Sequence, residues 1–306
     1  MKKKNNIKIL CYHGVTDAKF KGIENYNNKH ISKLEFDKQM FYLKKCENVI
    51  PLKNLININK KKDGTIITFD DGFKNNYNVA YKILKKYNLP ATFFICPGMI
   101  SKKKLFWVDL IESYINQTKI KKFTVYLKKK HIFETHSIKA KIFTCEQIKK
   151  YCKNINNREK DTFIKNLKKR LKIKNLKINK KIHETLSWND LNIMIKNNKI
   201  DIGLHSFKHE ILSMLEKKEL KKNIKKSLNL IYNKTKVKTI LAAYPEGQKN
   251  HYNNNIIKNL KNFGIKICPT AIKGQNANNT NLFFLRRYMV GFKGIDFPFK
   301  NYKKFS

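Results

Sequence analysis

The sequence predicts an α/β fold in which helices cover a parallel sheet. Short apolar runs rich in β-branched residues alternate with stretches whose apolar residues recur at helical spacing. Strands separated by helices of this length pair in parallel through right-handed crossovers. The 306 residues are enough to bury a full core, and the 41% apolar content excludes wholesale disorder.

Seven apolar runs are expected to form the strands of this sheet. Their number suits a closed or nearly closed barrel as well as an open sheet, and the pattern alone leaves both open. The runs are Ile7–Tyr12, Thr65–Phe69, Ala91–Cys96, Ile200–Leu204, Thr239–Tyr244, Gly264–Cys268 and Phe283–Val290.

The helices are expected between these strands. The first begins at Ser32, and Glu35 three residues later completes the pattern of a capping box, in which each side chain binds a free backbone amide of the first turn. The predicted helices are Ser32–Cys46, Asn75–Tyr87, Leu215–Tyr232 and His251–Phe263.

One segment, residues 101–186, interrupts the alternation. It is lysine-rich and mostly helical in pattern, with a short strand expected at Phe123–Leu127. At this length it is more than a connection between two elements. We therefore expect a single domain over residues 1–306 that carries residues 101–186 as an inserted, mainly helical subdomain.

The charge is the most conspicuous feature of the composition. Lys plus Arg number 67 against 22 Asp plus Glu, a formal balance of +45. Only 4 of these cations are Arg, and the chain also holds 38 Asn. Arginine is the side chain that makes bidentate contacts to phosphates and bases, so a specific nucleic-acid partner is not expected. A/T-rich codons specify Lys, Asn and Ile, which makes genome composition the simpler explanation.

The cysteines and the N-terminus indicate the compartment. The six cysteines form no CxxC pair, and several lie in apolar runs, so neither a disulfide framework nor a cysteine zinc site is expected. Met1–Lys4 is basic, but the apolar run after it is too short for a signal peptide. We expect a cytoplasmic protein whose lysines allow peripheral contact with an anionic membrane.

Two carboxylates mark the strongest local signal. The apolar strand Thr65–Phe69 runs directly into Asp70, Asp71 and Gly72. Adjacent like charges raise one another's pKa, and burial adds to this, so such a pair is costly unless it is used. Strand C-termini are also where α/β folds place their sites. The structural alternative is that an aspartate caps the following helix.

Two histidines follow another strand. His205 and His209 stand four residues apart after Ile200–Leu204. If the turn is helical, both imidazoles project from one side, as two ligands to one metal do. Together with an aspartate from another strand end, they make the two-histidine, one-carboxylate set that leaves metal positions open for water and substrate.

These segments together resemble the polysaccharide deacetylase family, also known as the NodB homology or carbohydrate esterase 4 family. The resemblance spans most of the chain outside the insertion. It rests on Thr68–Gly72 (TFDDG), Ala91–Ile95 (ATFFI), Gly203–His209 (GLHSFKH), Tyr12–Val15 (YHGV), Leu186–Trp188 (LSW) and Ala243–Gly247 (AYPEG).

The resemblance implies a distorted (β/α) barrel holding one divalent metal ion, commonly zinc. Asp71, His205 and His209 would be the metal ligands, and Asp70 the general base toward a metal-activated water. A backbone amide of the family's third motif, which Ala243–Gly247 matches here, would face the oxyanion. Here that amide belongs to Glu246, with Tyr244 beside it and Gly247 allowing the tight turn.

The chain departs from the family pattern twice. Ala243 stands where many members carry an arginine that pairs with the catalytic aspartate. Arg286 or Arg287 can supply that cation, and Arg287 matches the family's later Leu-x-Arg-x-x-Val pattern better. The late histidine that many members use as general acid is also missing. We expect His13, at the end of the first strand, to replace it; the alternative is a structural histidine.

The expected function is metal-dependent removal of an N-acyl group, most simply acetyl, from an amino sugar of a cell-surface polysaccharide or its carrier-linked precursor. The lysine-rich surface would favour carriers that bear phosphate. Two alternatives stay open: hydrolysis of another C–N bond, such as a formamide or cyclic imide, and a non-catalytic protein that binds glycans or polyanions through a decayed site.

Overall fold

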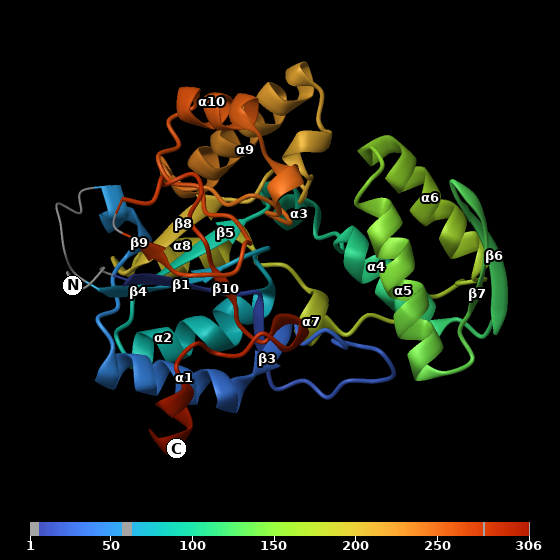
Figure 1. Ribbon diagram of the computed structural model, residues 1–306, viewed down its shortest axis with the longest axis horizontal. Coiled ribbons are helices and arrows are strands. Elements are labelled where there is room, and N and C mark those ends of the chain that lie inside the picture. The colour runs from blue at the N-terminus through green and yellow to red at the C-terminus, as the bar shows by residue number, and fades with distance from the viewer. Residues whose placement is uncertain (1–5, 57–62, 278, 306) are drawn as a thin grey trace.

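A parallel sheet forms the centre of the molecule (Figure 1). The computed structural model describes residues 6–56, 63–277 and 279–305. The strands of the main path all pair in parallel, so their carboxyl ends lie at one edge. In spatial order they are β10 (Tyr288–Met289), β1 (Asn6–Tyr12), β4 (Gly64–Phe69), β5 (Ala91–Ile95) and β8 (Ile200–Leu204), with β9 (Asn276–Ala277) antiparallel to β1.

Beyond β8 the sheet continues irregularly, and here the sequence predicted too much strand. Residues 239–244 and 264–268 form only isolated bridges, and β10 is the regular part of 283–290. Pro245 and Pro269, which directly follow the first two runs, cannot donate to a ladder. Backbone bonds still link neighbouring segments, from the Ala243 amide to the Leu204 carbonyl (2.9 Å) and from the Cys268 amide to the Leu282 carbonyl (3.0 Å). The sheet thereby curves back toward β10 as a distorted barrel.

Helices cover both faces of this sheet. In Figure 1, α1 and α2 lie on one side, and α9 and α10 on the other. The core between them is aromatic: Phe69 stacks on Phe93, with ring centroids 4.6 Å apart. The bounds are α1 (Lys33–Cys46), the π-helical η2 (Asn76–Tyr81), α2 (Lys82–Lys86), α3 (Pro97–Lys102), α8 (Trp188–Ile195), α9 (Lys217–Thr235) and α10 (Asn254–Asn262). A short parallel pair, β2 (Gly14–Thr16) and β3 (His30–Ser32), lies beside η2.

The predicted capping box at α1 forms only in half. The Ser32 hydroxyl accepts a hydrogen bond from the Glu35 amide at 3.1 Å, as expected. The Glu35 carboxylate instead accepts from the Gln39 side chain at 2.7 Å and from the Tyr302 hydroxyl. A tertiary contact from the C-terminal segment thus takes the place of the second capping bond.

The inserted segment packs around an apolar cluster of its own. The cluster includes Trp107, Ile111, Phe123, Ile148 and Leu167, and Ile23 from outside the segment joins it. The expected strand at 123–127 is present but pairs with a second one, so the segment carries a hairpin as well as helices. Its elements are α4 (Trp107–Gln117), β6 (Lys122–Leu127), β7 (Lys129–Glu134), α5 (Ile138–Cys152), α6 (Asn157–Arg170) and α7 (Lys180–His183).

Within the three described ranges of the chain, no helix is both long enough and apolar enough to cross a bilayer.

Candidate active site

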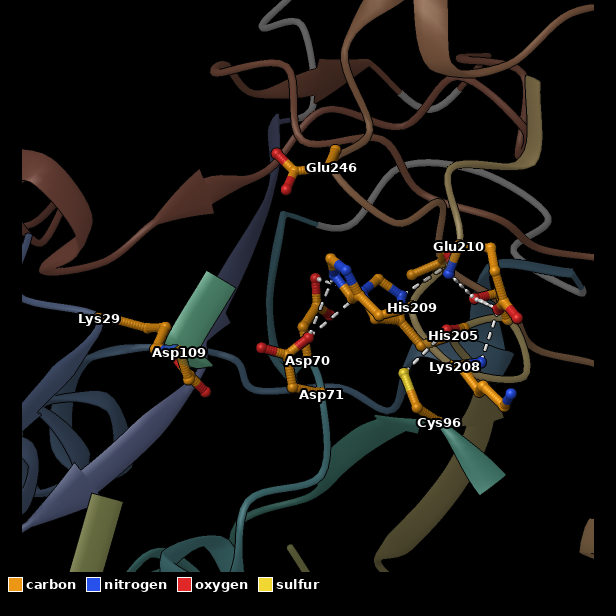
Figure 2. A network of polar contacts seen from close by, with 12 residues as sticks. Lys29, Asp70, Asp71, Cys96, Asp109, His205, Lys208, His209, Glu210 and Glu246 are labelled. Atoms are coloured by element: carbon orange, nitrogen blue, oxygen red, sulfur yellow. Dashed lines mark hydrogen bonds and ion pairs between the residues drawn. The ribbon is translucent and has the colours of Figure 1, made fainter. Parts of the chain in front are cut away.

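The two carboxylates and two histidines singled out from the sequence meet at the carboxyl edge of the sheet (Figure 2). Asp70 and Asp71 follow β4, and His205 and His209 follow β8. All four are buried, with exposed fractions between 1% and 9%. They line one cavity of about 610 Å³. The fold therefore brings together residues that lie more than a hundred positions apart in the sequence.

Asp71, His205 and His209 form a donor set of the kind that holds a metal ion. One ligand atom from each lies within 4.8 Å of the others. The Asp71 Oδ1 atom is 3.4 Å from His209 Nε2 and 3.7 Å from His205 Nε2. That oxygen is buried without a hydrogen-bond partner among the described residues, which is costly unless a cation completes it. These three residues fit a divalent ion.

Burial sets the protonation preferences of the donor set. It raises the pKa of the Asp71 carboxyl and lowers the pKa of both imidazoles. Both histidines are therefore held neutral, the form that ligates a metal. The His205 Nδ1–H group donates a hydrogen bond to the Ala243 carbonyl at 2.9 Å, which leaves Nε2 facing Asp71.

The backbone around these ligands is strained. Asp71 and His209 both have left-handed φ values, +75° and +61°. The turn after β8 is not the helix considered from the histidine spacing, because Ser206 is also left-handed (+57°). The Glu210 carboxylate holds this turn by accepting from the Ser206 hydroxyl (3.0 Å) and the Lys208 amide (2.6 Å). The two imidazole rings still lie 5.0 Å apart.

Arg287 makes a bidentate ion pair with Asp70. Its two terminal nitrogens each donate to one carboxylate oxygen at 2.8 Å, and its side chain is fully buried. Although burial alone would raise the pKa of Asp70, the guanidinium holds that pKa well below its usual range. Arg286, the other arginine considered, is exposed and reaches only the Lys273 carbonyl. Of the two, Arg287 is therefore the one that pairs with Asp70.

His13 lines the same cavity as the carboxylates. It is 9% exposed and stacks on Phe292 with ring centroids 5.3 Å apart. Its Nδ1 atom has no hydrogen-bond partner among the described residues. Burial lowers the pKa of His13, while Asp71 and Asp70 act in the opposite direction.

The third motif forms a tight turn above the metal donors. Glu246 and Gly247 have φ values of +61° and +52°. A Cβ at Gly247 would lie 2.5 Å from the Ala271 amide nitrogen, so only glycine fits. Tyr244 is fully buried and stacks on Tyr252 at 4.5 Å. Both Tyr244 and Glu246 line the cavity.

Sequence reasoning missed the wall of the cavity that the N-terminal part and the insertion form. That wall includes Lys29 of the N-terminal part and Glu146, Lys149, Lys150 and Lys153 of the insertion. Lysines are too frequent in this chain to attract notice. The sequence feature that could have indicated this wall is a pair of carboxylates within the apolar stretch 107–115. They are Asp109, which binds Lys29, and Glu112, which binds Lys149 at 3.0 Å.

The comparisons with known proteins agree with this fold. The family model described as polysaccharide deacetylase matches residues 57–268, more than half of the chain. The chain is a member of the polysaccharide deacetylase family, as its motifs indicated.

One curated relative is similar to part of the chain. The poly-β-1,6-N-acetyl-D-glucosamine N-deacetylase of Staphylococcus aureus strain MSSA476 is 34% identical over 125 residues, which are 36% of this chain and 42% of that protein. The match thus spans less than half of the curated relative.

Solved structures share the fold over nearly the whole chain. The Streptococcus pyogenes deacetylase PplD, in complex with acetate, has a TM-score of 0.61 at 17% identity and covers 96% of both chains. A de-N-acetylase from Aggregatibacter actinomycetemcomitans has a TM-score of 0.61 at 18% identity, covering 99% of this chain and all of its own. IcaB from Ammonifex degensii has a TM-score of 0.59 at 16% identity, covering 98% and 95%. These likenesses confirm the barrel fold expected from the motifs.

Proposed function

We propose that this chain hydrolyses N-acetyl groups on amino sugars of a glycan with the help of one divalent metal ion, zinc being the first to test. The observation that carries the proposal is the fully buried Asp70–Arg287 pair, 2.8 Å at both contacts, beside the Asp71, His205 and His209 donors. A binding site that had lost its catalytic activity would not need a buried carboxylate that is kept ionised, because burying an ion pair costs free energy.

The proposed roles follow from this geometry. A divalent ion held by Asp71, His205 and His209 would activate a water and polarise the acetyl carbonyl. Asp70 accepts the proton of the attacking water, and Arg287 keeps that carboxylate ionised and fixed in orientation. The Glu246 amide faces the developing oxyanion, in a turn that Gly247 makes possible.

We assign proton delivery to the departing amine to His13. It lines the same cavity as the proposed ligands and directly follows β1. Since burial favours its neutral form at rest, His13 must take up a proton within the catalytic cycle before it gives one to the amine.

The named relatives suggest the first substrate. The curated S. aureus relative is named for poly-β-1,6-N-acetyl-D-glucosamine. We propose a β-1,6-linked N-acetylglucosamine polymer, or its carrier-linked precursor, as the substrate of this chain.

An acetate-release assay tests the proposal. We expect the zinc-loaded protein to release acetate from β-1,6-linked N-acetylglucosamine oligomers, and chelation followed by gel filtration to remove more than about 90% of the rate. Re-addition of zinc should restore it. Chitin oligomers, an N-formyl sugar and a pyrophosphate-linked N-acetyl sugar complete the panel. Acetate release from none of the N-acetylated sugars would overturn the proposal.

A further inference from the structure

The inserted helix α5 forms part of the catalytic cavity. Glu146, Gln147, Lys149 and Lys150 on α5 line the cavity, as does Lys153, the residue that caps its C-terminal end. The same cavity is lined by Asp70, Asp71 and the two histidines. The insertion therefore takes part in the site, although the motifs that hold the proposed catalytic and metal-binding residues lie outside it.

Ion pairs attach this helix to both rims of the cavity. At one rim, Glu146 accepts from Lys293 at 3.0 Å and from the Tyr26 hydroxyl. At the other, the Lys153 ammonium lies 2.6 Å from the Glu246 carboxylate. Both contacts join the insertion to segments outside it, far away in the sequence. The position of α5 is thus tied to the geometry of the third-motif turn.

The turn at Glu246 needs support from outside. A non-glycine residue in the left-handed region is strained, and Glu246 adopts that conformation (φ +61°). Its neighbour Gly247 is left-handed as well, and Ala271 lies so close to Gly247 that no Cβ would fit there. Burial would raise the pKa of Glu246, but Lys153 and His209 lower it to about 2. The carboxylate is therefore ionised, and the pair with Lys153 persists at neutral pH.

We propose that Lys153 is a positioning residue for catalysis: its ammonium holds Glu246, and through it the turn whose amide faces the oxyanion. This inference rests on the proposed deacetylase function. The Lys153 side chain is 35% exposed, and an ion pair exposed to that degree contributes little to global stability. Its effect should appear in the geometry of the turn rather than in the folding equilibrium.

Lys153→Met tests this, with Lys139→Met as the matched control on the exposed start of the same helix. We expect kcat for β-1,6-linked N-acetylglucosamine oligomers to fall about 10-fold in Lys153→Met, with KM within about 2-fold of wild type. Zinc content and the thermal midpoint should stay unchanged. Lys153→Arg should keep most of the rate, and Lys153→Glu combined with Glu246→Lys should recover part of it.

A second measurement does not depend on turnover. Amide hydrogen exchange over residues 244–250 should speed up in Lys153→Met and not in Lys139→Met. Unchanged exchange there, or a kcat equal to wild type, would overturn the positioning role. So would a fall in kcat that merely follows loss of zinc or of folded protein. An inactive wild type would instead count against the proposed function, and the exchange result would still decide the role of Lys153.

Discussion

At the scale of single residues, Asp70 and Arg287 are the most telling pair. They come from segments 217 positions apart and are both buried, yet each carboxylate oxygen receives its own hydrogen bond. An ion pair in this setting contributes little net stability, but removing one partner leaves an uncompensated buried charge. The pair is better explained by the chemistry of Asp70 than by folding.

Arg287→Met should therefore destabilise the protein by about 3–5 kcal/mol in free energy of unfolding. The double variant Arg287→Met/Asp70→Asn should lose much less, because no lone charge stays buried. Urea unfolding of both variants and of Asp70→Asn alone measures the coupling. Strictly additive effects would show that the two side chains do not depend on each other.

His13 is the second residue on which the chemistry depends. We expect His13→Asn to lower kcat about 10²-fold while zinc content stays at the wild-type level, since the variant removes a proton donor and no metal ligand. His136→Asn, at an exposed position, is the control. The assignment would fail if His13→Asn turned over like wild type, or if it lost its zinc.

At the scale of elements, α4 supplies the carboxylates that bind two lysines of the cavity wall. Asp109 and Glu112 stand on one face of this helix and are both buried. Asp109 binds Lys29, and Glu112 binds Lys149 (3.0 Å) and the Asn25 amide (3.1 Å). These carboxylates thereby neutralise two lysines that line the cavity. A single helix of the insertion thus joins the N-terminal segment to α5.

Asp109 gives a stability prediction with a definite sign. Burial would raise its pKa, but Lys29 and His183 hold that pKa far below its usual value. Because its pKa is lower in the folded state, ionised Asp109 stabilises the fold at pH values above the unfolded-state pKa of about 3.9. This contribution is progressively lost as the pH falls below that pKa. Asp109→Asn should cost about 3 kcal/mol at pH 7 and about 1 kcal/mol less at pH 3.

Denaturant unfolding at the two pH values measures this difference. Asp161→Asn, an exposed position on α6, serves as the control and should change stability by less than about 0.5 kcal/mol. A cost for Asp109→Asn that is the same at both pH values would contradict the ionised pair.

At the scale of the whole molecule, the surplus of lysines is not reflected in the charge of the catalytic cavity. Four of the lysines that line the cavity are paired with carboxylates: Lys29 with Asp109, Lys149 with Glu112, Lys153 with Glu246 and Lys293 with Glu146. The +45 balance therefore belongs mainly to the outer surface. A preference for phosphate-bearing carriers would have to come from there, outside the catalytic cavity.

The sequence allowed the fold class and the metal donors to be predicted because both leave local patterns. Asp70 and Asp71 end an apolar strand, and the histidines end another. Arg287 stood out because arginine is scarce here and lies in an apolar run. The irregular strands after β8 were overestimated, because the prolines that interrupt their ladders lie just outside the apolar runs.

The wall formed by α5 could not be predicted in the same way. Its contacts, such as Lys153 with Glu246, join one of the chain's 63 lysines to a residue of a distant turn, and no local pattern encodes that approach. Asp109 and Glu112 were accessible in principle. Two carboxylates in the apolar stretch 107–115 indicate buried cationic partners, although not which ones.

We propose that Asp70 takes a proton from the attacking water while Asp71 holds the metal. The most direct measurement is zinc content and acetate release for wild type, Asp70→Asn and Asp71→Asn, side by side. We expect about one zinc per chain and active turnover in the wild type, zinc without turnover in Asp70→Asn, and weakened binding with weakened turnover in Asp71→Asn. Full turnover in Asp70→Asn, or full zinc content in Asp71→Asn, would contradict the account.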